Sequence, residues 1–330
     1  MENKRIGTML RRIFTNKVVI SFMIVIALLI IGEIAVPGFA SFQHIMTILQ
    51  TSFFLGMLSL GQTIVVISGK EGIDLSVGPM LTLGVILSSA ILMGKDSNFA
   101  FALIAVLVLG FGIGLVNGAG VSYLGITPLI MTLAWGTIVG GALLFITNGF
   151  PPGKASPILE LLGGGSLKFY LGSYLVEIPW VIIIWILIII AVLYVFKRTK
   201  IGSILYGIGA NDRAANLLGI KTKKIRMLAY GFSGMFSAFS GMLLLGYVTN
   251  PNLNVGLGFG LPSVVAIVIG GISLAGGAGS YLGAVAGSIV LTTLTSILVT
   301  FQIGESGRQM VTGAVLLILL VLYARKPRRA

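Results

Sequence analysis

The sequence predicts an all-α, polytopic integral membrane protein of about ten transmembrane helices, and three observations carry that prediction. Of its 330 residues, 56% are hydrophobic and 9% are charged, whereas soluble domains carry about 25% charged residues. The apolar residues gather into runs close to the roughly 20 residues that a spanning helix needs. The 46 glycines show no Gly-X-Y period, so their excess indicates close helix packing rather than collagen. Lipid is therefore the solvent for most of the chain.

Ten apolar runs are the predicted spans. The first follows a basic segment, as the core of a signal peptide does, but it exceeds the ~7–15 residues of such a core, which favours a retained anchor. The eighth is short and interrupted by glycine, so a re-entrant segment is an alternative there. The runs cover residues 18–36, 46–68, 75–93, 98–118, 127–147, 178–196, 227–248, 261–275, 281–301 and 309–324.

The basic residues give the predicted orientation. With ten spans and the N-terminus inside, 18 of the 22 Lys and Arg residues are cytoplasmic, eight of them in the loop 197–226, as the positive-inside rule expects. Both termini are then cytoplasmic, and the net charge of +13 needs no nucleic acid as a partner. We expect one transmembrane domain over residues 18–324, with cytoplasmic tails at 1–17 and 325–330. The external loop 148–177 is either a flexible connection or a surface for an extracytoplasmic partner.

An internal repeat emerges when the sequence is aligned with itself at an offset of 199 positions. Residues 61–84 then align with 260–283, nine of 24 positions agree, and both copies hold the pattern G-I-x-L-x-x-G. Repeats with glycine-broken segments at corresponding positions are typical of transporters near the solute path; the alternative is chance similarity between two glycine-rich helices. The predicted topology makes the copies parallel, and a re-entrant segment in one of them would make them inverted.

Glycines four residues apart form three stripes along the predicted spans. Small residues let helix backbones approach closely in lipid, so the stripes predict packing seams in a multi-helix bundle. They are Gly110, Gly114 and Gly118; Gly136 and Gly140; and Gly279, Gly283 and Gly287.

Several kinds of chemistry are excluded by what the sequence lacks. It holds no G-x-x-x-x-G-K-[ST] motif, so the chain has no P-loop for ATP. With no Cys and one His, His44, it offers no disulfide, no thiol catalyst and no zinc site built from Cys or several His. We therefore expect a transport protein without a metal or cofactor, rather than a membrane-embedded enzyme or a scaffold.

Five polar residues within or at the ends of spans are candidates for a solute path, with helix–helix hydrogen bonding as their alternative role: Gln62, Asp74, Asn117, Thr132 and Asn148. Asp74 precedes the third span, where its carboxylate can cap exposed N–H groups. An ion-coupled secondary transporter needs acids inside the membrane. Glu33 and Asp74 would have to serve it, and that class is the main alternative.

The cytoplasmic loop predicts one short helix. Asn211 can cap its N-terminus, Asp212 complements its dipole, and Gly219 suits the position after its C-terminus. Residues 212–218 make about 10 Å of helix, which is too short to be stable alone in water. The helix must therefore dock, either on its own bundle or on a cytoplasmic partner, through Ala214, Ala215, Leu217 and Leu218, with Arg213 beside them.

Four segments carry a resemblance to a known family: GIDLSVG at 72–78, ITPLIMTLAWGTIVGGALLFITNG at 126–149, YGIGANDRAANLLGI at 206–220, and VIGGISLAGGAGSYLGAVAG at 268–287. Over nearly its whole length the chain resembles the permease subunits of bacterial sugar-type ABC importers. These are the ribose, galactose, xylose and autoinducer-type permeases, with branched-chain amino acid permeases as more distant relatives. It departs from the common TGGIDLSVG pattern by reading SGKEGIDLSVG, with Lys70 and Glu71 inserted.

The resemblance implies three partners in a bacterial inner membrane: a separate ATPase, an extracytoplasmic sugar-binding protein, and a second permease copy or a related subunit. It assigns the short helix, together with Gly209 before it, to coupling with the ATPase. The resemblance implies a monosaccharide-like solute, and a predicted membrane interior nearly free of charge suits a neutral one. A nucleoside or a furanose signal is the alternative solute.

Overall fold

The computed structural model describes residues 17–69, 71–171 and 174–324. Except for Lys17, the predicted tails lie outside these residues, as does Lys70. The described part is mostly helical. Its elements are α2 Lys17–Ala35, α3 Phe42–Ile67, α4 Val77–Leu92, the 3-10 helix η1 Asp96–Asn98, α5 Phe99–Ser122, α6 Pro128–Thr147, α7 Pro157–Gly163, β1 Ser166–Leu171, β2 Tyr174–Pro179, α8 Trp180–Arg198, α9 Lys200–Ala210, α10 Asp212–Leu217, α11 Thr222–Val248, α12 Gly260–Ile269, α13 Tyr281–Thr300 and α14 Glu305–Ala324.

Each of the ten predicted spans overlaps a helix, but the eighth is helical only as far as Ile269, where α12 ends. Seven helical stretches of the described residues are long and apolar enough to cross a membrane, whereas α4 and α12 are shorter. A backbone in lipid must satisfy its own hydrogen bonds, which is why long apolar runs become helices. The structure therefore supports a multi-pass membrane protein, and the count of ten spans stays a prediction.

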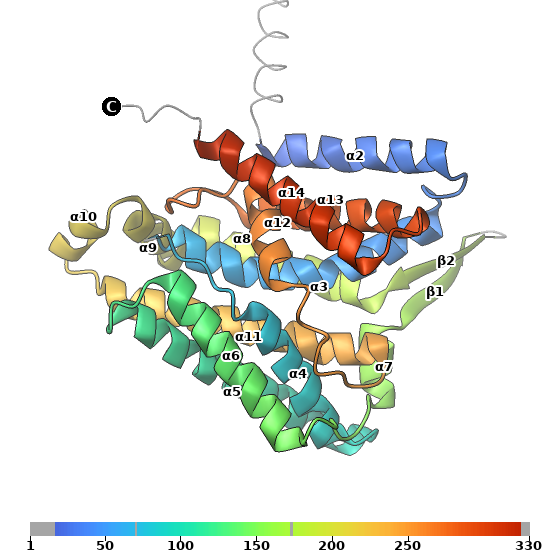
Figure 1. The fold of residues 1–330 in the computed structure, drawn as a ribbon, viewed down its shortest axis with the longest axis horizontal. Helices are drawn as coiled ribbons and strands as arrows, with labels where there is room; N and C mark the ends of the chain where they lie inside the picture. Colours follow the sequence, from blue (N-terminus) through green and yellow to red (C-terminus); the bar gives the residue numbers. More distant parts are fainter. Residues whose placement is uncertain (1–16, 70, 172–173, 325–330) are drawn as a thin grey trace, which may run out of the picture.

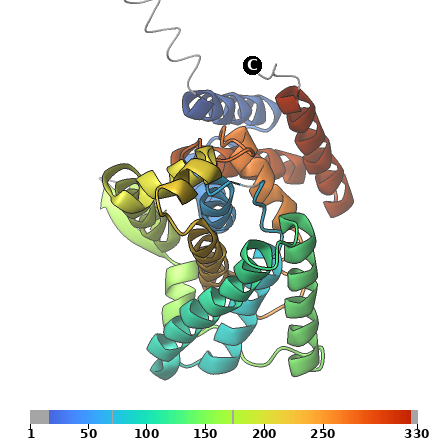
Figure 2. The ribbon, with the colours of Figure 1, turned by 90° about the vertical axis from the view of Figure 1, so that its left-hand side faces the viewer.

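The two central helices, α3 and α11, are buried over most of their length, while α2, α5, α6 and α8 leave most of their apolar surface exposed. Figure 1 shows α9 and α10 at one end of the long axis and α7 with the β-hairpin at the other. Viewed from the first end, α14 and α6 stand at one edge with α12 between them (Figure 2). An apolar rim around a buried centre is the arrangement expected of a bundle in lipid.

The glycine stripes form packing seams, with one exception. Gly110, Gly114 and Gly118 of α5 lie against the α11 backbone between Met227 and Ala238, where a Cβ would have no room. Gly283 and Gly287 of α13 likewise face the backbone of α12 and of Gly270, which follows it. Gly136 contacts Ser76 and Pro79, but Gly140 faces open space, so the second stripe is a seam at one glycine alone.

The described residues of the loop 148–177 form regular secondary structure. Two of its elements are strands, which corrects the all-α prediction. It contains α7 and an antiparallel hairpin in which Lys168 pairs with Glu177 at 3.1 Å. Leu159 of α7 is fully buried, and Gly163 packs on the α11 backbone at Leu243 and Gly246. Residues 166–169 alternate polar and apolar side chains, as a strand does. The alternation is too brief to predict a hairpin, because each strand has only six residues.

Candidate functional site

The segment between α3 and α4 turns back into the bundle and is held there by side chains. Gln62 clamps it: its Nε2 donates to the Asp74 carbonyl at 2.6 Å, and its Oε1 accepts from the Asp74 N–H at 3.1 Å. The same Nε2 also donates to Ser263 Oγ of α12 at 3.2 Å. A non-helical backbone at this depth needs such partners, because it has no helical hydrogen bonds of its own.

The Asp74 carboxylate is buried, with 1% of the residue exposed. Its Oδ1 accepts the Ser76 N–H at 3.0 Å, just before α4 begins, and its Oδ2 accepts Ser233 Oγ–H of α11 at 2.7 Å. Asn117 Nδ2 of α5 donates to Oδ1 at 3.3 Å. A carboxylate with several donors is satisfied in a low-dielectric interior, so Asp74 fastens the turn to two other helices.

Thr132 of α6 completes this framework, because its Oγ1 accepts the Leu75 N–H at 3.1 Å. Four of the five predicted path residues are thus brought together around residues 72–76. Asn148 is apart from them: it ends α6 in a left-handed conformation and is exposed. Their mutual hydrogen bonds are the helix–helix role that the sequence left open.

The two copies of the predicted repeat meet at one end of the bundle. The Gly277 N–H of the second copy donates to the Ile67 carbonyl of the first at 3.0 Å. Gly209 of α9 packs against both copies, at Ile67 and at Gly277, with no space for a Cβ. Three stretches of backbone are therefore in direct contact, and the two repeat turns lie side by side.

The predicted cytoplasmic helix is present as α10, one residue shorter than expected. Asn211 caps it, with its Oδ1 accepting the Ala214 N–H at 3.0 Å, and Gly219 follows it with a φ of +79°. Ala215 is buried against the bundle, whereas Leu217 is 89% and Leu218 80% exposed. Part of the apolar face of α10 therefore packs on the bundle, whereas Leu217 and Leu218 are not covered by any described part of the chain.

Two side chains that sequence analysis missed tie the loop 197–226 to the repeat turns. Arg226 donates from Nη2 to Asp212 Oδ1 at 2.7 Å and from Nε to the Ser68 carbonyl at 3.2 Å. Tyr206 donates from its hydroxyl to the Gly279 carbonyl at 2.8 Å. Burial raises the pKa of the Tyr206 phenol, so it stays a hydrogen-bond donor. Each turn thus receives one side-chain hydrogen bond from this loop.

The described residues contain no group of three or more His, Cys, Asp or Glu placed to hold a metal ion. The chemistry available around the turns is hydrogen bonding by neutral groups, by the buried Asp74 carboxylate and by two cations, Arg226 at Ser68 and Lys17 at Gly271. These groups hold the backbone of the two turns in place.

Comparison with known proteins gives a family over most of the chain. Residues 44–320 match the family described as branched-chain amino acid transport system / permease component. A probable ABC transporter permease protein of Sinorhizobium fredii, y4mJ, is 32% identical, with 96% of this chain and 92% of that protein covered. The ribose import permease protein RbsC of Escherichia coli is 30% identical, with 96% and 97% covered.

A third relative is the galactose/methyl galactoside import permease protein MglC of Escherichia coli, which is 29% identical, with 92% of this chain and 94% of that protein covered. No solved structure shows a significant match.

Proposed function

The chain belongs to the branched-chain amino acid transport system / permease component family, and on that premise we propose that it carries a neutral, monosaccharide-like solute into the cell. It is a permease subunit of a sugar-type ABC importer, a multi-pass protein of the bacterial cytoplasmic membrane and not an enzyme. Relatives named for ribose and galactose import support a sugar as the solute. The small share of charged residues, 9% of the chain, supports a neutral one.

We propose three partners: an ATP-binding subunit in the cytoplasm, an extracytoplasmic binding protein that delivers the solute, and a second permease copy or a paralogue. The exposed Leu217 and Leu218 suit a groove in the ATP-binding subunit, since apolar side chains at the tip of a basic loop gain most from being covered. Gly209 to Gly219 form the contact segment, with Arg213 on its exposed side.

The proposed topology has ten spans, a transmembrane domain over residues 18–324 and both tails in the cytoplasm. In support, α2 begins and α14 ends toward the end of the molecule that holds α9 and α10 (Figure 1). The hairpin and α7 lie at the opposite end, which becomes the external face. The distribution of Lys and Arg agrees with this orientation.

One observation carries the proposed mechanism: the cytoplasmic loop is bonded to both repeat turns, through Arg226 to Ser68 and through Tyr206 to Gly279. When ATP binding draws the two ATPase domains together, α10 moves with its groove and pulls both turns. The turns border the framework of Gln62, Asp74, Asn117 and Thr132, so the same movement changes access to a path beside it.

Uptake in cells tests the proposal. The chain is expressed with the ATP-binding subunit and the secreted binding protein encoded beside it, in a host without its own sugar importers, and labelled D-ribose, D-galactose, D-fructose and adenosine are supplied. Uptake of a sugar that stops when the ATP-binding subunit is inactivated supports the proposal. Adenosine uptake would favour the nucleoside alternative.

The same assay tests the alternative of an ion-coupled secondary transporter. That class requires an acid inside the membrane, and Glu33 accepts hydrogen bonds from the backbone N–H groups of Gly38 and Ala40 at a helix end. We expect Glu33→Gln to retain uptake. Transport that continues without the ATP-binding subunit but stops in Glu33→Gln combined with Asp74→Asn would instead establish a secondary transporter.

A further inference from the structure

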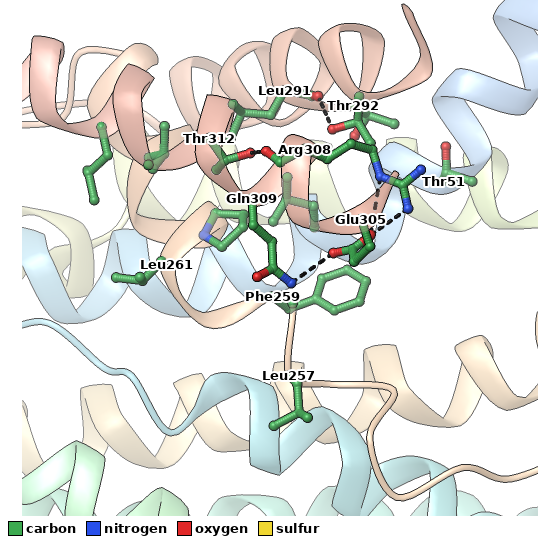
Figure 3. A pocket seen from close by; sticks show the side chains of 17 residues that line it. Thr51, Leu257, Phe259, Leu261, Leu291, Thr292, Glu305, Arg308, Gln309 and Thr312 are labelled. Atoms are coloured by element: carbon green, nitrogen blue, oxygen red, sulfur yellow. Dashed lines mark hydrogen bonds and ion pairs between the residues drawn. The ribbon is translucent and has the colours of Figure 1, made fainter. Parts of the chain in front are cut away.

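A pocket of about 530 Å³ lies between α3, α12, α13 and the first turns of α14 (Figure 3). Its volume is within the roughly 300–1,000 Å³ of small-molecule sites. The connections that border it, residues 249–259 and 301–304, are external in the proposed topology. A solute released by a binding protein outside the cell would reach this pocket before it reached the repeat turns.

The polar side chains of the pocket form a cluster of planar groups whose charges cancel. Arg308 Nε donates to Glu305 Oε2 at 3.2 Å, and Gln309 Nε2 donates to Glu305 Oε1 at 3.0 Å. Arg308 also donates from Nη2 to Glu305 Oε2 and from Nη1 to the Ile303 carbonyl. Because a guanidinium has five N–H donors and a carboxylate about four acceptor positions, two donors and one acceptor position are left for a ligand. Adjacent donors and acceptors on rigid planar groups match neighbouring hydroxyls, because they bind two atoms at once.

An aromatic ring faces the same space. Phe259 lies next to the Gln309 amide and the Glu305 carboxylate in Figure 3, with Leu257 below it. Thr292 of α13 lines the pocket beside Arg308. A flat apolar ring beside convergent polar groups provides one surface for C–H groups and another for hydroxyls. A ring-shaped polyol has both kinds of surface.

We infer that this pocket is the external solute-binding site of the permease and that it takes a neutral, polyhydroxylated ring. Phe259 packs against the C–H face of the ring, while Glu305, Arg308 and Gln309 bind its hydroxyl groups. A charged solute would be repelled at close range by Glu305 or Arg308, whichever carries the same sign of charge. The inference rests on the proposed function and adds to it the place where the solute is held.

The chain offers a direct test because it contains no cysteine. Single substitutions Thr292→Cys and Leu257→Cys place a thiol on the pocket lining, and Leu187→Cys places one on α8, where the side chain is 62% exposed on the apolar rim. The full chain, assembled with its partners in membranes, is treated with a charged methanethiosulfonate reagent. Labelling is followed with and without the sugar that the wild type takes up among D-ribose, D-galactose and D-fructose.

We expect the reagent to label positions 292 and 257 and to leave position 187 unlabelled, because a charged reagent reacts in water and not in lipid. The sugar should slow labelling in the pocket by occupancy, about tenfold at ten times its Kd. A pocket thiol that is never labelled would show that lipid or protein fills the space. Labelling at an unchanged rate in saturating sugar would also overturn the assignment.

Phe259→Leu gives a second readout, since it keeps an apolar side chain and removes the ring. We expect the KM for uptake to rise about tenfold, and thermal unfolding of the purified variant shows whether it folds as the wild type does. An unchanged KM would count against the site. Sugar uptake without protection of the pocket thiols overturns this assignment alone, whereas absence of uptake for every probe sugar overturns the proposed function together with it.

Discussion

The Arg226 Nη2 lies 2.7 Å from the Asp212 carboxylate, and the Nε of the same guanidinium donates to the Ser68 carbonyl at 3.2 Å. Arg226 is 3% exposed, so the pair joins the first residue of α10 to the end of α3 from within the bundle. Only a planar, forked cation can hold both acceptors in fixed geometry. In the proposed mechanism, this pair transmits the movement of α10 to the first repeat turn.

Arg226→Lys should separate ATP hydrolysis from transport. Lysine keeps the charge but places one compact donor where two directed donors are needed. We expect uptake to fall about tenfold, equivalent to ~1.4 kcal/mol, while ATP hydrolysis by the assembled transporter continues. Both rates are measured on the same proteoliposomes. Loss of hydrolysis and uptake in equal proportion would show that Arg226 serves assembly instead. Glu71→Ala, an exposed acid beside the same turn, is the control and should change neither rate.

Leu217→Glu combined with Leu218→Glu should release the ATP-binding subunit. Both side chains are almost fully exposed at the tip of α10, so the substitution places charges in the proposed contact without disturbing the permease core. We expect co-purification of the ATP-binding subunit to be lost and the thermal unfolding of the permease to be unchanged. Leu124→Glu is the matched control: Leu124 is 76% exposed in the α5–α6 connection. Undiminished co-purification of the double variant would contradict the assigned contact.

Gln62→Leu should lower the stability of the permease. It leaves the Asp74 N–H and carbonyl without their partners, and each buried unsatisfied group costs about 1–3 kcal/mol. The measurement is thermal unfolding of the purified chain in detergent, with Gln43→Leu, at an exposed position of α3, as the control. If uptake were lost at unchanged thermal stability, Gln62 would contact the solute rather than hold the turn.

Gly114→Ala and Gly140→Ala should have opposite effects. A Cβ at Gly114 meets the Tyr230 carbonyl of α11, whereas one at Gly140 meets nothing within 4 Å. Because backbone cannot move aside cheaply, we expect the first to unfold at a clearly lower temperature. The second gains up to ~1 kcal/mol from the better helix propensity of alanine. Equal unfolding temperatures for the two variants would show that α5 and α11 are not in close contact.

Thr249→Gly should stabilise the chain. Thr249 ends α11 at a φ of +64°, a region in which a β-branched residue is strained. Its backbone bond, in which the Thr249 carbonyl accepts the Ala155 N–H at 2.9 Å, survives the substitution. We expect a gain of about 1 kcal/mol, read as a higher unfolding temperature. Thr127→Gly, at an ordinary φ of −58°, should destabilise, and a loss in both variants would exclude strain at Thr249.

Local signals were read correctly from the sequence. Asn211 caps α10 and Gly219 follows it because capping depends on neighbours a few residues away. The apolar runs became helices because lipid leaves a backbone no other partner. Gln62, Asp74, Asn117 and Thr132 were chosen as polar residues within or at the ends of spans, and the structure brings them together because buried polar groups need hydrogen-bond partners; their role in a solute path stays a prediction.

Hydrogen-bond partners that lie far apart in the sequence cannot be predicted from such local patterns. Arg226 lies in a strongly basic loop, and nothing near it in the sequence distinguishes it from the solvent-facing residues around it. Its acceptors are 14 and 158 residues away. Glu305 and Arg308 fall between the predicted spans 281–301 and 309–324, and nothing near them in the sequence indicates a pocket, because the pocket that they line exists only once α3, α12 and α13 surround them.

The contact of Gly69, Gly209 and Gly277 has a consequence for leakage. Where side chains close a passage, one rotamer change lets water or an ion slip through. Here the three glycines meet backbone to backbone, and a glycine has no side chain that could swing aside. In the proposed mechanism this contact closes the path toward the cytoplasm, and such a closure yields only when a whole segment of chain is displaced, which limits leakage between transport cycles.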